Sequence, residues 1–97
     1  MKNDGRAFYV IAYDIANNKR RAKIARAMEA LGARVQGSVF EAWLTPAELK
    51  KLTGRAAKIL NAEEDSLRYY MVCEACRDKI QTQGKARTTP PPSLMIV

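Results

Sequence analysis

The chain has 97 residues, of which 47% are hydrophobic and 28% charged, as in one small folded domain. Its apolar runs are shorter than the ~20 residues that cross a bilayer, and its N-terminus is unlike a secretory signal. Two cysteines are too few for a disulfide scaffold, so we expect a cytoplasmic protein. The net charge of +7 is concentrated in residues 1–38 and favours either a nucleic-acid partner or simply a soluble surface.

The first elements are a strand and a helix. Residues 7–14 form an apolar run rich in β-branched and aromatic residues, which predicts a strand. A polar cluster follows, in which Asn17 or Asn18 can cap a helix. Apolar residues at helical spacing then continue to Leu31. Gly32 is expected to end this helix in a left-handed conformation.

The middle of the chain predicts a second strand and a second helix. Residues 34–44 indicate one strand, with a bulge or a close backbone approach at Gly37. The segment TPAE at 45–48 has the pattern of a capping box with proline at the first helical position. Helical spacing of apolar residues then predicts a helix to about Leu60.

The last third of the chain predicts short strands and a linker. After an acidic loop, residues 66–73 indicate a third strand, and a polar connection at 76–79 leads to a short fourth strand at 80–83. Three consecutive prolines make residues 84–92 a linker, because proline cannot pair in a β-ladder. Residues 94–97 form a terminal apolar strand that would be costly to leave in water.

This element order predicts the fold class. The order β-α-β-α-β-β with a trailing strand, and with both helices on one face, indicates an α/β (α+β) ferredoxin-like sandwich of the βαββαβ type with an antiparallel sheet. Residues 1–83 would form the domain, and residues 84–97 the linker and the C-terminal strand. That strand is expected to pair with the sheet edge of a second copy, the alternative being a fold-back onto its own chain.

Three segments match a known family from about Phe8 to Cys76. They are YVIAYDI at 9–15, NKRRAKIARAMEALGARVQGSVFEAWLTPAEL at 18–49 and EEDSLRYYMVCEAC at 63–76. Together they resemble the CRISPR-associated endoribonuclease family, the small universal CRISPR adaptation protein. The resemblance implies a homodimer that works with the CRISPR integrase subunit as a DNA-binding scaffold in spacer acquisition. It also implies metal-dependent cleavage of single-stranded RNA or double-stranded DNA.

Asp14 is the candidate catalytic and metal-binding residue. It ends an apolar strand, a position where a rigid element holds a functional carboxylate in place. One carboxylate is a poor ligand for Mg²⁺ (or Mn²⁺), so we expect a two-fold axis near the first strand to pair Asp14 from two copies. The resemblance places the conserved family aspartate at Asp14. The alternative is that Asp14 accepts hydrogen bonds from loop amides.

Tyr13 is the second catalytic candidate, because it lies beside Asp14 and could line the same cleft; otherwise it is a half-buried strand residue. The chain contains no histidine. This excludes an imidazole general base, as well as Ser–His and Cys–His nucleophiles.

A run of cations at the start of the first helix is the candidate nucleic-acid site. Lys19, Lys23 and Arg26 share one helical face, and Arg20 and Arg21 flank it. Cations at a helix start oppose the helix dipole, which is easier to understand if phosphates bind there. The alternative is a solvated helix face with no ligand.

Further candidates lie on the first helix and around the second strand. The resemblance assigns functional positions to Arg21, Lys23 and Arg34. Ser38 could donate to a phosphate or simply lie in the sheet, and Phe40 is expected in the core rather than as a base-stacking platform.

Cys73 and Cys76 form a C-x-x-C pair that could indicate zinc or redox chemistry. A closed zinc site needs four ligands, and one chain offers neither histidine nor another cysteine. We therefore expect no cofactor at this pair.

Two functions from different classes remain. The first is a scaffold of the integrase complex with metal-dependent endonuclease activity through an Asp14 pair. The alternative is a non-catalytic nucleic-acid-binding module of ferredoxin-like fold. A module of the RNA-recognition type is disfavoured, because Phe8 and Tyr9 point to opposite faces and no suitable glycine-aromatic run is present.

Overall fold

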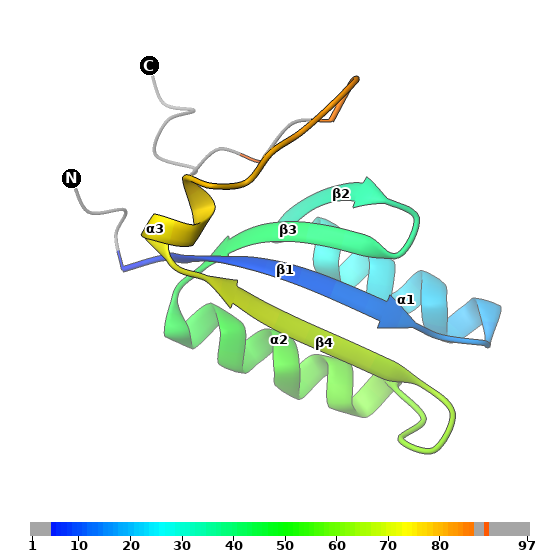
Figure 1. The fold of residues 1–97 in the computed structure, drawn as a ribbon. Coiled ribbons are helices and arrows are strands. Elements are labelled where there is room, and N and C mark those ends of the chain that lie inside the picture. Colours follow the sequence, from blue (N-terminus) through cyan, green and yellow to red (C-terminus); the bar gives the residue numbers. More distant parts are fainter. Residues whose placement is uncertain (1–4, 87–88, 90–97) are drawn as a thin grey trace.

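The computed structural model describes residues 5–86 and 89 and shows a four-stranded sheet with helices on both faces (Figure 1). The elements are β1 (Ala7–Asp14), α1 (Asn18–Glu29), β2 (Gly32–Gln36), β3 (Val39–Leu44), α2 (Pro46–Ile59), β4 (Ser66–Val72) and α3 (Glu74–Arg77). The sheet order is β2-β3-β1-β4 and every neighbouring pair is antiparallel. The predicted ferredoxin-like βαββαβ fold is confirmed.

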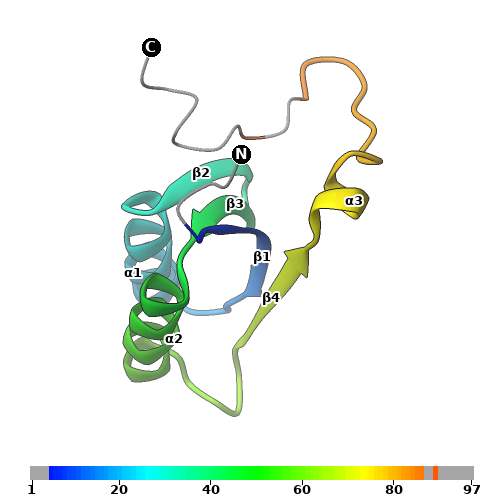
Figure 2. The ribbon, with the colours of Figure 1, turned by 90° about the vertical axis from the view of Figure 1, so that its left-hand side faces the viewer.

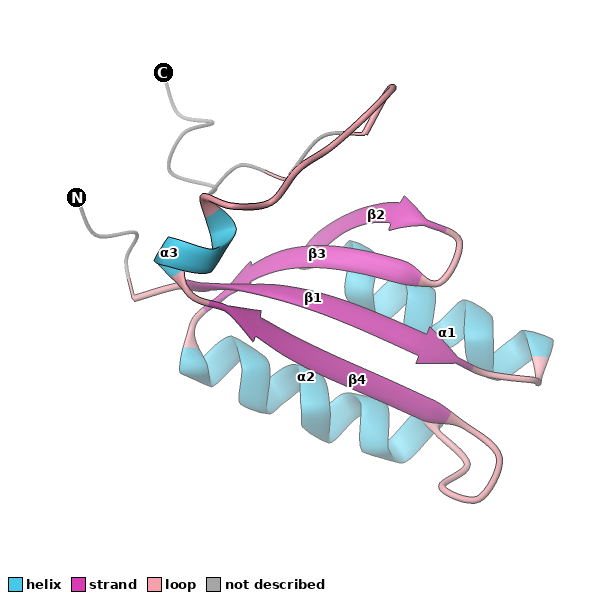
Figure 3. Cartoon of the chain, viewed as in Figure 1, coloured by secondary structure: helices cyan, strands magenta, loops and turns pink. Residues whose placement is uncertain are grey.

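The helices divide between the two faces of the sheet. Both α1 and α2 cover one face, whereas the short α3 lies on the opposite side (Figures 2 and 3). We call the side opposite α1 and α2 the open face. No helix in the described part of the chain is long and apolar enough to span a membrane.

The core forms between the sheet and the two long helices. Strand β1 is central, and its residues Ile11 and Tyr13 point toward the helices and are buried. Ile24 and Met28 of α1 pack onto them and are no more than 1% exposed. Full burial of side chains of this size stabilises a fold by about 1.5–3 kcal/mol each. The predicted apolar stripe of the first helix is therefore confirmed.

The segment predicted as one strand at 34–44 is a β-hairpin instead. Strands β2 and β3 pair with each other and are joined by a turn at Gly37 and Ser38. The register irregularity falls between Arg34 and Gln36, so the predicted bulge at Gly37 is also wrong. The prediction missed the break between the two strands because β2 lies at the sheet edge and is largely exposed. Its residues therefore show no alternation of buried and exposed positions from which the end of the strand could be recognised.

Gly32 begins β2 rather than ending α1 in a left-handed conformation. Helix α1 closes at Ala30, which has ordinary right-handed backbone angles. A Cβ atom on Gly32 would lie 2.5 Å from the carbonyl oxygen of Glu41 on β3. Glycine is therefore required at this position by the close approach of two strands, and not by a helix cap.

The caps of the two long helices confirm their predictions. The side chain of Asn17 accepts a hydrogen bond from the backbone N–H of Arg20 at 2.9 Å. Thr45 and Glu48 exchange the two hydrogen bonds of a capping box at the start of α2. These local signals fix where each helix begins, and hence which residues each helix turns toward the sheet.

The C-terminal elements differ from the prediction. Residues 74–77 form α3, although a polar connection was predicted at 76–79. The prediction of a short strand at 80–83 is wrong. Successive turns continue from α3, with the N–H of Ile80 bonded to the carbonyl of Arg77 at 3.1 Å, so the chain does not extend beside the sheet. The predicted strand at 94–97 lies outside the described residues.

Two glycine substitutions test this packing. We expect Gly32→Ala to lower the free energy of unfolding by about 1–3 kcal/mol, because the new methyl group would press on the backbone of β3. Gly54→Ala, inside α2 with no atom beyond its own turn of helix within 4 Å of the new Cβ, should raise it by about 0.5–1 kcal/mol. Urea unfolding measures both changes, and equal effects would contradict the hairpin contact.

Candidate functional site

Asp14 is the last residue of β1, lies on the open face and pairs with Ser66 of β4, the strand beside β1 in Figure 1. Side chains alternate along a strand, so Asp14 shares this face with Val10 and Ala12, whereas Tyr13 points toward the helices. The carboxylate is exposed, and no described residue forms a hydrogen bond or ion pair with it. Asn17, not Asp14, caps the helix that follows.

One chain offers few ligands for a metal ion at this position. In the described ranges, no three Cys, Asp or Glu side chains gather closely enough to hold one. Asp14 therefore presents a single exposed carboxylate. One carboxylate supplies fewer oxygen ligands than a divalent cation needs to complete its coordination.

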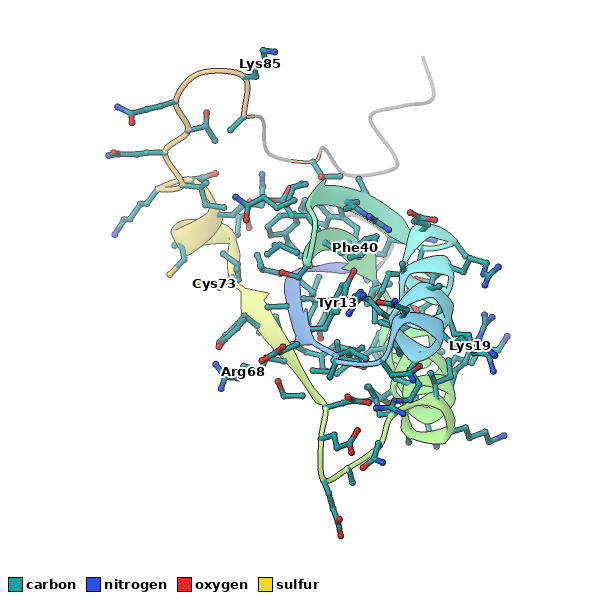
Figure 4. All side chains as sticks on the ribbon, turned by 90° about the vertical axis from the view of Figure 1, so that its right-hand side faces the viewer. Tyr13, Lys19, Phe40, Arg68, Cys73 and Lys85 are labelled. Carbon is teal, nitrogen blue, oxygen red and sulfur yellow. The ribbon has the colours of Figure 1, made fainter. Side chains whose placement is uncertain are left out.

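The open face around Asp14 is mixed and close to neutral. Its middle carries Val10 and Ala12 of β1 beside Tyr70 of β4, which is 50% exposed. One acid, Glu41 on β3, and one base, Arg68 on β4, lie on the same face. Figure 4 shows Arg68 on the side of the sheet away from the helix that carries Lys19.

One end of the open face is already covered. The guanidinium of Arg77 on α3 lies 5.0 Å above the ring of Trp43. The indole of Trp43 donates a hydrogen bond of 3.0 Å to the carbonyl of Thr89 and packs against Phe8 with 5.2 Å between ring centroids. The end that carries Asp14 has no such cover among the described residues.

Tyr13 joins the β2–β3 turn to the central strand. Its hydroxyl donates a hydrogen bond of 2.8 Å to the carbonyl of Gly37, and its backbone N–H donates to the carbonyl of Ser38 at 3.1 Å. Its buried ring lies 6.1 Å from that of Phe40, which is fully buried, as predicted for a core residue. The catalytic role of Tyr13 stays a prediction, as does phosphate binding by Ser38.

Arg20 binds the acidic loop that precedes β4. Its Nε lies 2.7 Å from Oδ2 of Asp65, and its Nη2 lies 2.9 Å from Oε1 of Glu64. The hydrogen bond from Arg20, aided by one from the backbone of Asn61, lowers the pKa of Asp65. Arg20 therefore holds this loop against α1 and is already paired with two carboxylates.

Arg21 and Arg34 also make contacts within the chain. Arg21 donates to the carbonyl of Ile15 at 2.6 Å and to the side chain of Asn18, which fixes the loop directly after Asp14. Arg34 pairs with Glu29 at 3.1 Å. Their predicted contacts with nucleic acid remain predictions, and the structure adds that both side chains already have partners.

Lys19, Lys23 and Arg26 are exposed on α1, as predicted for one helical face. Lys23 and Arg26 line a groove of about 410 Å³ between α1 and α2, together with Arg55, Lys58 and Ile59 of α2. Sequence reasoning missed the two α2 cations. Their spacing of three residues was visible, but only the packing of the two helices brings them beside α1.

The excess positive charge belongs entirely to the two long helices. Together α1 and α2 carry nine Lys and Arg residues and two Glu residues. The remaining residues of the chain carry eight basic and eight acidic side chains, so the helices account for the whole net charge of +7. The positive field therefore lies over one layer of the molecule, on the side away from the open face (Figure 4).

Cys73 and Cys76 are exposed free thiols. Cys73 caps α3, and its sulfur accepts the backbone N–H of Cys76 at 3.4 Å. Hydrogen bonds from Cys76 lower the pKa of the Cys73 thiol. With no further Cys, Asp or Glu gathered around it in the described residues, the pair alone does not make a metal site.

The fold and the site define a class of protein: a ferredoxin-like α+β domain with a cationic helical layer and an exposed carboxylate on the opposite sheet face. The sequence profile of the family described as CRISPR associated protein Cas2 matches residues 7–80. The chain therefore belongs to this family, as the resemblance implied.

Individual relatives agree with this assignment. The chain is 43% identical over 89 residues to the CRISPR-associated endoribonuclease Cas2 3 of Synechocystis sp., covering 92% of this chain and 97% of that protein. A crystal structure of a hypothetical protein from Thermus thermophilus is 36% identical with a TM-score of 0.73, covering 90% and 99%. A chain of a partial Cas6-RT-Cas1–Cas2 complex is 34% identical with a TM-score of 0.70, covering 78% and 89%.

The Arg20–Asp65 pair gives a pH-dependent prediction. Because the folded state lowers the pKa of Asp65, the pair stabilises the protein above the ordinary aspartate value of 3.8, and this contribution is lost as the pH falls through the folded pKa. We expect Asp65→Asn to lower the melting temperature at neutral pH, and its difference from wild type to shrink at pH below 3.8.

Glu63→Gln is the matched control, because Glu63 lies in the same loop, is not one of the two carboxylates that pair with Arg20, and its change removes the same charge. A loss of stability as large in the control, or a difference from wild type that does not depend on pH, would contradict a specific role for the pair.

Proposed function

We propose that the protein is a dimeric nucleic-acid-binding subunit of the CRISPR spacer-acquisition machinery, and that paired Asp14 residues give it metal-dependent endonuclease activity. The observation that carries the proposal is the exposed Asp14 carboxylate, which has no partner among the described residues and lies on the open face. The endoribonuclease name of the Synechocystis relative and the Cas1–Cas2 complex of a structural neighbour support it.

The dimer would form through the open face. Strand alternation places Asp14 on the same face as Val10 and Ala12, and the half-exposed ring of Tyr70 lies beside them. This face is close to neutral, so two copies can approach without the repulsion that two cationic helical layers would create. A two-fold axis near the end of β1 would then bring both Asp14 carboxylates together.

Paired carboxylates would fit a hard divalent cation better than one chain does. Two Asp14 side chains, with phosphate oxygens and water, supply the oxygen ligands that Mg²⁺ or Mn²⁺ takes. The bound ion would supply Lewis-acid polarisation of the scissile phosphodiester. Asp14 would hold it at the end of a rigid strand, and Arg21 would keep the following loop clear of the carboxylate through its bond to Ile15.

Tyr13 would act as a positioning residue. Its hydroxyl already bonds to Gly37, and its ring lies in the core on the other side of β1 from Asp14. It would fix the end of β1 and thereby the direction of the neighbouring carboxylate.

The helical layer would hold the nucleic acid. Lys19, Lys23 and Arg26 are exposed on α1, and the two long helices carry the whole positive excess of the chain. Such a layer attracts double-stranded DNA or single-stranded RNA through the phosphates, and a homodimer would carry it on both outer sides. The integrase subunit is the expected protein partner.

Asp14→Asn tests the catalytic half of the proposal. We expect the variant to lose Mg²⁺- or Mn²⁺-dependent cleavage by at least 100-fold, an order-of-magnitude figure for removing a charge that the reaction needs. Its affinity for a duplex should stay within about twofold, because the helical layer is unchanged. Cleavage of labelled single-stranded RNA and double-stranded DNA and a binding titration measure both properties.

Asp78→Asn, an exposed aspartate beside α3, is the control that removes the same charge elsewhere. Equal cleavage by wild type and Asp14→Asn would point to a contaminating nuclease. Absence of cleavage in the wild type, with duplex binding retained, would favour the alternative of a non-catalytic nucleic-acid-binding module.

A further inference from the structure

Four cations face one another across the contact between the two long helices. Lys23 and Arg26 project from α1, Arg55 and Lys58 project from α2, and all four line one groove with a volume of about 410 Å³. Each pair is separated by three residues, so its members lie on the same side of their helix. Like charges at this spacing destabilise a helix by a few tenths of a kcal/mol, so the arrangement opposes folding when nothing is bound.

Neighbouring carboxylates do not neutralise these cations. Glu29 pairs with Arg34, whereas Glu64 and Asp65 pair with Arg20. The Glu48 carboxylate accepts one capping-box hydrogen bond, from the backbone N–H of Thr45, and lies 3.6 Å from Nε of Arg6. The four groove cations have no ion-pair or hydrogen-bonding partner among the described residues.

We propose that this groove binds the phosphate backbone of a nucleic-acid duplex, which extends the contact surface of the proposed function from α1 onto α2. Side chains three residues apart are about 5–6 Å apart at their Cβ atoms, and packed helices lie about 8–10 Å apart. Each strand of B-DNA carries one phosphate per ~3.4 Å of helix axis. Successive phosphates of a strand also wind around that axis, so they lie farther apart than this rise, and a groove of these dimensions can contact about two neighbouring phosphates of one strand.

The lining of the groove favours backbone contact over base contact. Ile59 is its one apolar lining residue, and no aromatic ring on which a base could stack lines it. The exposed large hydrophobic residues of the described chain, such as Tyr70 and Ile80, lie on other elements, so a lipid surface would find no apolar anchor here. Binding in the groove is therefore independent of base sequence.

The groove is separate from the metal site proposed at Asp14. It lies between α1 and α2, which cover one side of the sheet (Figure 2), whereas strand alternation places Asp14 on the open face. Neutralising the groove should therefore weaken binding without removing the groups that would cut the phosphodiester.

The test is the salt dependence of duplex binding by the double variant Arg55→Gln and Lys58→Gln. Each lost phosphate contact lowers the slope of log affinity against log salt by about 0.9, so the slope should become shallower by about 1–2. Both positions are exposed and glutamine is a good helix former, so the fold should persist, which circular dichroism checks. The conservative pair Arg55→Lys and Lys58→Arg should keep the wild-type slope.

Lys79→Gln with Lys85→Gln is the matched control. It removes the same charge from residues beyond α3, and Figure 4 shows Lys85 far from α1 and α2. A slope lowered equally by this control would indicate a general charge effect and overturn the groove site. An unchanged slope in the Arg55 and Lys58 variant would overturn it as well.

Two further outcomes separate this inference from the proposed function. If the wild type binds duplex with a steep slope that the groove variant shares, the groove inference fails while nucleic-acid binding stands. If the wild type binds no duplex even at about 50 mM salt, where phosphate contacts are strong, the groove inference and the proposed nucleic-acid binding both fail. Tighter binding to phosphatidylserine vesicles than to duplex would also overturn the groove inference.

Discussion

The alternation of side chains along β1 is the constraint on which the rest of the structure depends. β1 is a central strand, so the side chains on one of its faces are buried against the helices, and those on the other face point to the open face. Tyr13 and Asp14 are neighbours in sequence, yet one lies in the core and the other in solvent. A slip of one residue would exchange them and bury an unpaired carboxylate, which the core does not tolerate.

Charge follows the same division into two sides. The two long helices carry all of the net positive charge, and the rest of the chain is balanced. A neutral sheet face can meet an identical copy, whereas a cationic layer repels one and attracts a polyanion. Arg20 and Arg21 belong to that layer by sequence but stabilise the acidic loop and the loop after β1. The cations of the layer left for a ligand therefore include Lys19, Lys23 and Arg26 on α1 and Arg55 and Lys58 on α2.

Local signals made much of the fold predictable. The first strand, both long helices and the Thr45 capping box depend on residues within a few positions of one another, and all were predicted. Contacts distant in sequence were not predictable. The need for Gly32 comes from Glu41 on another strand, the role of Arg20 comes from a loop that precedes β4, and Arg55 meets α1 only after the helices pack. Asp14 was singled out because a polar residue ends an apolar strand and because the resemblance places the family aspartate there, and its role stays a prediction.

The solution mass of the chain tests most directly whether the open face is a self-association surface. Sedimentation equilibrium, with nucleic acid removed, should give twice the chain mass of 10.9 kDa for the wild type and the mass of one chain for Tyr70→Lys, which adds a charge to that face at a half-exposed position. A wild type with the mass of one chain, or a Tyr70→Lys variant that stays paired, would contradict the account.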